Sequence, residues 1–524
     1  MWKVPADRTV YWGVWALLAL GLAVRLVVLI HFGFRYIGID DALIQQVAID
    51  YGHGIFREPF LYGQNYNPML EALLAAPFVR IGADPWIVLP IVTSLLALWP
   101  FWSCALWCQR KGFSTAALLI AATPLLLPLE WDLITTQSRG FVHGLALLGF
   151  VPWTQGIRRL FPRFLLTSLV LALSIWCNPN TAPVVAGIVV WLSGHHFRSK
   201  EFWITGIAGL GLLFILHQWS QTYYADHPER LIHPLTTSDL AFSADRILNG
   251  LRHFDQHILH VIPFASIAAG TLPVLLVLGL AFLIRRGRTL EVFSLFTIAI
   301  CMILALGILK VHEGCTSVFF PKSRMFLALP LILGVLAAMV AKDIRIGSTW
   351  MLACVVVLAA STVFKVIPID SVIQRELVEQ DCAYVREEPI ALLRERCALV
   401  SKLAEDHHAD LVVPIRWPGI RVDHRAHFQA HFTCYACPVL TGFPPVYGAG
   451  YDRRTWLRNT YGGPAPGRVL FVGGDPNAWA RAEAEHAGIE RIGDRSIELH
   501  MIQSDTASVE RIITALGVDD DLGR

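Results

Sequence analysis

Long apolar stretches recur along the first 366 residues and are separated by short polar segments. A helix needs about 20 mostly apolar residues to cross a bilayer, and eleven stretches approach that length. These predicted spans cover 10–32, 86–108, 114–129, 139–157, 164–179, 181–197, 202–222, 262–284, 290–309, 325–341 and 348–366. The pattern therefore predicts an α-helical polytopic membrane protein.

The pattern changes after residue 366. Residues 1–366 contain 44 charged side chains, whereas the 158 residues of 367–524 contain 40. Apolar runs in the tail predict strands at 410–414, 468–473 and 497–502, and the segments near 371–408 and 476–487 predict helices. We expect a membrane module over 1–366, with a large first outside loop at 33–85, and a small extracytoplasmic α/β domain over 367–524.

Composition supports this division. The chain is 55% hydrophobic and 16% charged, whereas soluble domains carry roughly 25% charged residues. This composition excludes a soluble cytosolic enzyme. The formal net charge of +2 gives no reason to expect a nucleic-acid partner.

Basic residues predict the orientation in the membrane. With a cytoplasmic N-terminus, the cytoplasmic segments contain fourteen Lys and Arg against four Asp and Glu. Lys and Arg favour short cytoplasmic loops, so the tail is expected outside, in a periplasm-like space. The first apolar stretch lacks a small-residue cleavage site and is expected to remain as a span. The predicted cytoplasmic loops are short, so we look for chemistry in the outside loops.

An acidic pair, Asp40-Asp41, follows the first span closely. The pattern predicts that Asp40 caps a helix starting at Asp41, and a solvated helix cap is the simplest interpretation. Acidic groups at a membrane boundary are costly and often functional. Such a carboxylate can act as a general base toward an acceptor hydroxyl, and the pair can also bind a divalent cation.

A polar turn with aromatic flanks follows this pair. Gln64, Asn65 and Tyr66 offer hydrogen bonds suited to a sugar, although the same residues can equally end and cap helices. The segment 68–82 is too short to span a bilayer and predicts a helix lying at the interface.

These features resemble the GT-C membrane glycosyltransferases, and most closely the branch of protein O-mannosyltransferases and the aminoarabinose transferase of lipid A. The resemblance rests on the acidic pair after the first span and on the string YGQNY…LEALLAAP. It also rests on Lys322–Pro330, KSRMFLALP. It covers residues 8–366 in architecture, and the stronger matches are confined to 38–82 and 322–330.

The resemblance implies an inverting transfer of a sugar from a polyprenyl-phosphate donor to a protein, lipid or glycan acceptor. The expected site is the outer face of a bacterial inner membrane, with Asp40 or Asp41 as the base and Asp40 preferred. The leaving phosphate needs fixed cations, for which Arg is well shaped. Candidates are Arg324, Lys322, Arg139, Lys310 and His312, with interfacial anchoring as the alternative for the long cations.

Further acidic residues are candidates for substrate contact. Glu130 and Asp132 follow the third span, where a helix-end pair is an equal alternative, and Glu313 lies beside the cationic residues. Arg25 lies within the first span and is expected to pair with an unidentified acidic residue inside the bundle.

Two groups of residues have the spacing of metal ligands. His253, His257 and His260 fall on one helical face, which suits zinc or an amphipathic helix. A second group lies in the tail: His424, His427, His431, Cys434 and Cys437. An oxidising compartment instead favours two disulfides among Cys382, Cys397, Cys434 and Cys437, with open connectivity. The other six cysteines are expected only to pack.

Two other functions remain open from the sequence. A lipid or glycan transporter would show repeat symmetry and ionisable groups within spans, whereas here these groups cluster in outside loops and no internal repeat is evident. An oligosaccharide ligase with a diphosphate-linked donor would share the chemistry proposed above but use a larger donor.

Overall fold

The computed structural model describes residues 8–342, 344, 347–378, 387–415, 436–437, 439–440, 467–486, 488–492, 499–503 and 506–516. The chain forms two compact units, each assembled from segments far apart in the sequence. Unit 1 comprises Met1–Gly33, Pro90–Tyr223 and Leu235–Cys382. Unit 2 comprises Phe34–Leu89, Tyr224–Pro234 and Ala383–Arg524. The first outside loop, which the sequence placed in the membrane module, therefore groups with the tail.

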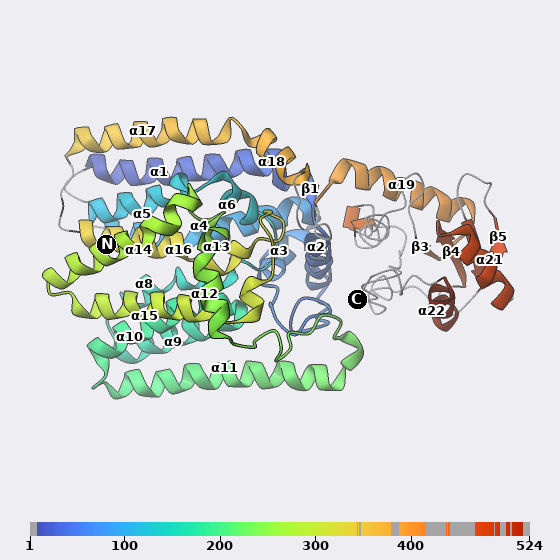
Figure 1. Cartoon of the computed structure of the whole chain (residues 1–524), viewed down its shortest axis with the longest axis horizontal. Coiled ribbons are helices and arrows are strands. Elements are labelled where there is room, and N and C mark those ends of the chain that lie inside the picture. The colour runs from blue at the N-terminus through green and yellow to red at the C-terminus, as the bar shows by residue number, and fades with distance from the viewer. Residues whose placement is uncertain are drawn as a thin grey trace. The chain divides into compact units, whose positions relative to one another are not determined.

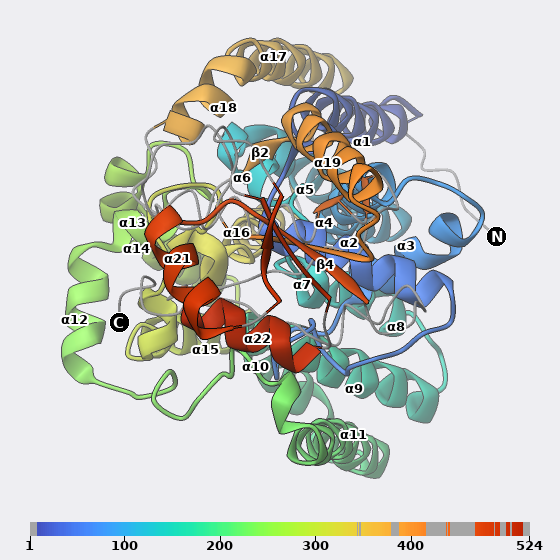
Figure 2. The ribbon, with the colours of Figure 1, turned by 90° about the vertical axis from the view of Figure 1, so that its right-hand side faces the viewer.

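Unit 1 is a helical bundle. Its long helices run side by side in Figure 1, and α1, α11 and α17 are seen nearly end-on in Figure 2. Packed pairs include α10 with α15, α5 with α16, and α1 with both α5 and α17. The helices up to residue 226 are α1 (Arg8–Val28), the π-helix η1 (Leu29–Gly33), α4 (Pro85–Arg110), α5 (Ser114–Leu126), α6 (Leu129–Ile134), α7 (His143–Leu148), α8 (Val151–Thr154), α9 (Leu160–Cys177), η2 (Pro179–Thr181), α10 (Ala182–His196) and α11 (Lys200–Asp226).

The second half of unit 1 continues the bundle. Its helices are α12 (Ala244–Arg252), α13 (Phe254–Ile258), α14 (Ala265–Arg285), α15 (Thr289–Ala305), η4 (Leu309–His312), η5 (Lys322–Phe326), α16 (Leu329–Ala341), α17 (Ser348–Val366) and α18 (Ile369–Val378). Gly287, at φ 68°, makes the tight turn between α14 and α15, because a residue without Cβ adopts the left-handed conformation at little cost.

Seven helices among the described residues are long and apolar enough to cross a membrane, and α5 and α15 are shorter apolar helices. The protein is thus an α-helical membrane protein, and the count of eleven spans stays a prediction. The single span predicted at 139–157 is wrong, because the chain forms the short helices α7 and α8 there. Pro152 has no N–H to donate to the carbonyl oxygen of Leu148, where α7 ends. This interrupts the hydrogen bonds of the helix.

The N-terminal segments of unit 2 are mostly helical. They contain β1 (Tyr36–Ile37), α2 (Ile39–Gly52), α3 (Leu70–Arg80) and η3 (Pro228–Arg230). Helix α3 confirms the short helix predicted at 68–82, and it packs against α2. Strand β1 pairs antiparallel with β2 (Glu388–Pro389), which explains why the first outside loop and the tail fall in one unit.

The tail of unit 2 forms a small mixed sheet with strand order β3-β4-β6-β5. Strand β3 (Leu411–Pro414) is parallel to β4 (Arg468–Val472), and β6 (Leu499–Gln503) is antiparallel to β4 and to β5 (Glu490–Arg491). The helices of this part are α19 (Ile390–Asp406), α21 (Pro476–Glu485) and α22 (Thr506–Ala515). The strands predicted at 410–414, 468–473 and 497–502 correspond to β3, β4 and β6, and the helix predicted at 476–487 corresponds to α21. The segment 371–408 forms α18 and α19 rather than one helix, and β5 and α22 were not predicted.

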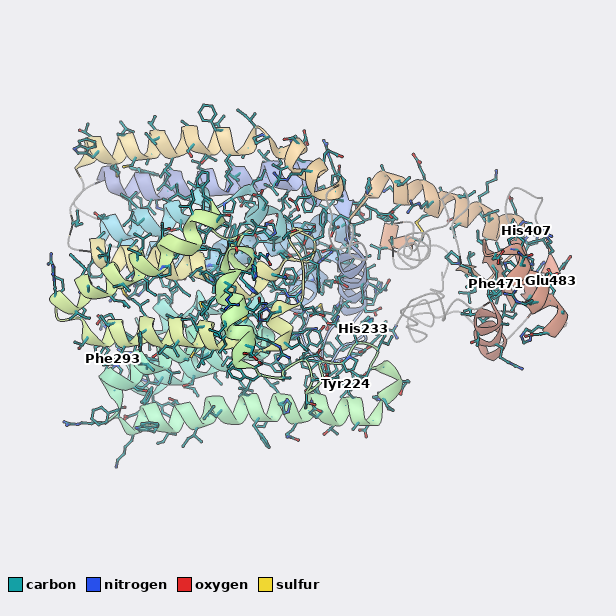
Figure 3. All side chains as sticks on the ribbon, viewed as in Figure 1. Tyr224, His233, Phe293, His407, Phe471 and Glu483 are labelled. Atoms are coloured by element: carbon teal, nitrogen blue, oxygen red, sulfur yellow. A yellow bond between two sulfur atoms is a disulfide. The ribbon has the colours of Figure 1, made fainter. Side chains whose placement is uncertain are left out.

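The two faces of this sheet bury different residues, as the alternation of side chains along a strand requires. Val413 and Phe471 pack into a cluster with Trp479 of α21, and Val412 and Leu470 pack with residues of α19. Figure 3 shows Phe471 on β4 and Glu483 on α21 within this small domain.

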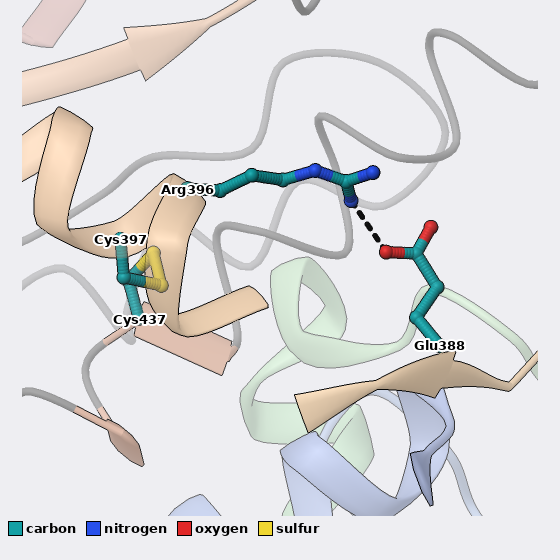
Figure 4. Close-up of a disulfide and its surroundings, with 4 residues drawn as sticks. All are labelled: Glu388, Arg396, Cys397 and Cys437. Carbon is teal, nitrogen blue, oxygen red and sulfur yellow. Dashed lines mark hydrogen bonds and ion pairs between the residues drawn. A yellow bond between two sulfur atoms is a disulfide. The ribbon is translucent and has the colours of Figure 1, made fainter. Parts of the chain in front are cut away.

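A disulfide joins Cys397 of α19 to Cys437, and beside it Arg396 forms a buried ion pair with Glu388 of β2 (Figure 4). This bridge confirms one disulfide among the four tail cysteines. Cys315 is also disulfide-bonded, so the expectation that it only packs is wrong. Cys382, Cys434 and the predicted ligands His424, His427 and His431 lie outside the described residues.

Candidate functional site

A cationic cluster lies between α15 and α16 in unit 1. Lys310 Nζ lies 2.6 Å from Glu313 Oε2, and Arg324 Nη2 lies 3.0 Å from the same oxygen. The Arg324 guanidinium also stacks over the ring of Phe320, at 4.3 Å from its centroid. Two cations therefore converge on one carboxylate oxygen.

Lys322 is the third cation of this cluster, and two histidines, His312 and His257, border it. Lys322 Nζ lies 3.4 Å from Gln256 Oε1 on α13. His312 Nε2 lies 2.6 Å from the carbonyl oxygen of Leu306, and a carbonyl only accepts, so Nε2 bears the proton. The structure thus brings together four predicted residues from 312–324: His312, Glu313, Lys322 and Arg324.

His257 contributes a neutral ring to this region. Its imidazole packs edge-to-face against His312, with ring centroids 5.1 Å apart, and also contacts Phe326. Burial, together with the nearby His312 and Lys322, lowers the pKa of His257 to about 4. At neutral pH His257 therefore adds no positive charge to that of the lysines and Arg324.

The predicted zinc ligands of this segment do not form a metal site. His253 separates α12 from α13, whereas His257 and His260 are buried at 2% exposure. In the parts of the chain that the structure describes, no three His, Cys, Asp or Glu side chains are grouped so that they could hold a metal ion.

Arg139 contacts the loop between Glu313 and Lys322. Its guanidinium Nη1 donates a hydrogen bond to the carbonyl oxygen of Phe319, and its side chain is buried. The structure therefore places this predicted phosphate ligand on the backbone of the loop.

Glu130 and Asp132, both on α6, form ion pairs. Asp132 Oδ1 lies 3.1 Å from Arg25 Nη2, and Asp132 Oδ2 lies 2.5 Å from Lys365 Nζ. Glu130 Oε1 lies 2.8 Å from Arg375 Nη2. The prediction that Arg25 has an acidic partner inside the bundle is confirmed, while the role of both acids in substrate contact stays a prediction.

Asp40 and Asp41 lie in the first turn of α2, in unit 2. Because α2 begins at Ile39 and its N-cap is Gly38, the prediction that Asp40 caps the helix is wrong. Asp41 is buried, and its Oδ2 accepts the Gly38 N–H at 3.1 Å, which satisfies a free donor of the helix end.

Asp40 differs from its neighbour. It is partly exposed, and its carboxylate forms no hydrogen bond or ion pair with any residue that the structure describes. The described residues group no third His, Cys, Asp or Glu with the pair, and a divalent cation at this position stays a prediction.

The predicted sugar-binding residues Gln64, Asn65 and Tyr66 are half-buried in a loop of the same unit. Gln64 forms a bridge with His233 of the segment after α11. Figure 3 labels His233 and also Tyr224, which lies in the last turn of α11. The structure thus joins this loop to a segment more than 150 residues later in the chain.

Two buried acids support the loop, and neither was predicted from the sequence. Asp50 Oδ2 accepts from Arg57 Nε at 2.8 Å and from the Tyr62 hydroxyl at 2.7 Å. Burial and this carboxylate raise the pKa of Tyr62. Glu58 Oε2 accepts the Gly63 N–H at 3.1 Å and the Tyr224 hydroxyl at 3.2 Å. The feature of the sequence that could have indicated Glu58 was Arg57-Glu58, a charged pair inside an aromatic stretch.

The comparisons with known proteins add no family. No protein-family model matches the chain, and no characterised protein shows significant similarity to it. The function must therefore be argued from the residues themselves.

Proposed function

We propose that the protein is a membrane glycosyltransferase that transfers a sugar from a polyprenyl-phosphate donor to a hydroxyl acceptor, with Asp40 as the general base. The observation that supports this proposal is the contrast within the acidic pair. The Asp41 carboxylate accepts a hydrogen bond from the backbone N–H of Gly38, whereas Asp40 is partly exposed and has no partner among the described residues. A general base needs a carboxylate that is free to accept a proton.

The proposed step is a single displacement. The acceptor hydroxyl gives its proton to the Asp40 carboxylate as its oxygen bonds to the anomeric carbon. The bond from that carbon to the phosphate oxygen breaks on the opposite face, and the polyprenyl phosphate leaves with the electron pair. The anomeric configuration is therefore inverted, and no oxidant, reductant or further reactant is needed.

The cationic cluster of unit 1 suits the leaving group. Lys310, Lys322 and Arg324 come from the ends of one loop, and they offer charge-assisted hydrogen bonds to phosphate oxygens. The planar guanidinium of Arg324 matches phosphate with two parallel donors, and its stacking on Phe320 limits its freedom. Gln64, Asn65 and Tyr66 are proposed to bind the sugar or the acceptor.

The location follows the charge pattern of the loops. We propose a bacterial inner membrane, with the N-terminus in the cytoplasm and the catalytic loops and tail in the periplasm, in contact with membrane lipids. A reporter fused after Arg524 tests this orientation, which is wrong if the reporter is found in the cytoplasm.

The test of the reaction is turnover of purified protein with a panel of radiolabelled polyprenyl-phosphate sugars. Wild type is expected to release sugar to an acceptor or to water, and Asp40→Asn to lose that activity by about 100- to 10,000-fold. Asp84→Asn, at the exposed start of α4, is the control and should keep full activity. Lack of turnover with every monophosphate donor would reject the proposal and favour a diphosphate-linked donor or a transporter.

A further inference from the structure

The loop Gly314–Pro321 links the two halves of the cationic cluster. Lys310 and Glu313 precede it, and Lys322 and Arg324 follow it. Its ends are held together because the Cys315 N–H donates to Phe320 O at 2.9 Å and the Lys322 N–H donates to Cys315 O at 3.2 Å. The loop therefore sets the spacing between Glu313 and the cations that follow.

Gly314 shows how closely the ends of this loop approach. Its φ is 121°, and a Cβ built there would lie 2.7 Å from the carbonyl oxygen of Phe320. Only glycine fits this position without a shift of the backbone. A displacement at one end of the loop is thus passed directly to the other end.

The tip of the loop is buried and is held by two charged side chains from distant segments. Arg139 Nη1 donates to the carbonyl oxygen of Phe319, and Glu376 Oε2 of α18 accepts the Val318 N–H at 3.1 Å. Val318 and Phe319 are fully buried, and Arg139 and Glu376 are less than a tenth exposed. Arg139 thus binds a backbone carbonyl of the tip, and Glu376 binds a backbone N–H on the adjacent residue.

These contacts satisfy backbone groups that water cannot reach. A buried N–H or C=O without a partner is unfavourable, and a charged partner makes the stronger hydrogen bond. Loss of either anchor leaves a polar group of the tip unsatisfied. The buried position of the tip then becomes less favourable. Movement of the tip out of this position displaces both ends of the loop.

We propose that Arg139 and Glu376 are positioning residues of the donor-phosphate site. They bind the loop tip rather than the phosphate. Through the loop they hold Lys310 and Arg324 converged on Glu313, and Lys322 beside Gln256, before the donor binds. A preorganised site binds more tightly because less ordering is left to the binding step. This inference rests on the proposed function, in which these cations bind the donor phosphate.

Glu376→Ala and Glu376→Gln separate the proposed role from other effects. Alanine removes the acceptor for the Val318 N–H, whereas glutamine keeps an amide oxygen that can accept it. Asp370→Asn is the control, because Asp370 lies on the same helix α18 and pairs with His31 at 2.8 Å, but it binds no described residue of the loop. All variants are purified in detergent, and their folding is compared by thermal unfolding.

Two readouts are measured on each protein. The first is the Kd for a polyprenyl monophosphate in detergent micelles, and the second is hydrogen exchange of the peptide covering 314–324. For Glu376→Ala we expect a Kd about tenfold higher and clearly faster exchange in this peptide. Glu376→Gln and Asp370→Asn should stay within about twofold of wild type in both readouts.

The outcomes separate this inference from the proposed function. If wild type binds the lipid and Glu376→Ala binds it equally well, the positioning role is overturned. If wild type binds no polyprenyl monophosphate, the proposed donor is wrong, and the exchange data then decide whether Glu376 holds the loop. Unchanged exchange in Glu376→Ala overturns the role in either case. If Glu376→Ala does not fold, Arg139→Met replaces it, with Arg139→Lys as the variant expected to restore binding.

Discussion

Asp132 and Arg25, 107 residues apart in the sequence, form an ion pair with N–O distance 3.1 Å, and both side chains are almost fully buried. Arg25 also donates to the backbone oxygen of Asp132 at 2.8 Å and stacks over Trp131. Lys365 contacts the other carboxylate oxygen of Asp132. One buried carboxylate therefore balances two cations and joins α1, α6 and α17.

Removal of this carboxylate should destabilise unit 1 strongly. Asp132→Asn leaves two buried cations without their shared counter-ion, and we expect the free energy of unfolding to fall by about 3–5 kcal/mol. Glu130→Gln is the control, because Arg375 is 45% exposed and such pairs contribute less than about 1 kcal/mol. Unfolding by SDS in mixed micelles measures the free energy of unfolding of both variants. Equal stability of Asp132→Asn and wild type would show that the ion pair is not structural.

The sequence was sufficient for local structure but not for these pairings. Apolar runs predicted the long helices and the strands β3, β4 and β6, since periodicity and run length act over a few residues. The partner of Arg25 was not predictable, because nothing in the local pattern around Asp132 indicates a residue 107 positions earlier.

The same limit applies to the candidate site. The group from His312 to Arg324 was predictable because these residues are close in the sequence. Arg139 was predicted as a phosphate ligand from its charge and position, yet its contact with Phe319 depends on tertiary packing. Glu376 and Glu58 were missed because their burial, not their residue type, distinguishes them from solvated acids.

Asp40 and Asp41 should respond differently to substitution. Asp41 accepts the Gly38 N–H at the start of α2, so Asp41→Ala is expected to lower the free energy of unfolding by about 1 kcal/mol. Asp40→Ala should leave stability unchanged, because the Asp40 carboxylate has no partner among the described residues. Thermal unfolding of the two variants side by side measures the difference. A larger loss of stability in Asp40→Ala would contradict the capping role of Asp41.

Acid should destabilise the cationic region through His257. Its pKa is lowered from 6.5 to about 4 in the folded protein, so the unfolded chain binds more protons between these values. Stability is therefore full above about pH 6.5 and falls as the pH drops toward 4, by at most about 3 kcal/mol. His257→Asn should reduce this dependence, while the exposed His253→Asn should not. Thermal unfolding at pH 7.5 and 5.0 tests this, and identical slopes for wild type and His257→Asn would refute it.

The disulfide between Cys397 and Cys437 should stabilise the tail. The two residues are 40 apart in the sequence and both are buried. Replacing both by alanine frees this loop in the unfolded state, and we expect a loss of about 2–4 kcal/mol. Cys354→Ala, which removes an exposed free cysteine, is the control. Unfolding with and without reductant should show a larger difference in wild type than in the double variant, which keeps the disulfide of Cys315.

Glu313 and Arg324 should affect donor affinity in opposite directions. The Glu313 carboxylate occupies the same cations that would bind a phosphate, so Glu313→Gln is expected to lower the Kd for a polyprenyl monophosphate by about two- to fivefold. The effect is modest because Glu313 is 41% exposed and screened by solvent. Arg324→Gln should raise the Kd by about tenfold, since a charge-assisted contact to phosphate is lost.

Arg198 provides the matched control for this pair, because it also stacks on a phenylalanine, Phe197, with a distance of 5.3 Å to the ring centroid. Arg198→Gln should leave the Kd unchanged, since Arg198 follows α10 in a loop that is predicted to be cytoplasmic. Added salt should weaken binding to wild type more than to Arg324→Gln, because fewer charges then contribute. If Glu313→Gln weakens binding as Arg324→Gln does, Glu313 organises the cations instead of competing for them. If all three variants bind like wild type, the phosphate binds elsewhere.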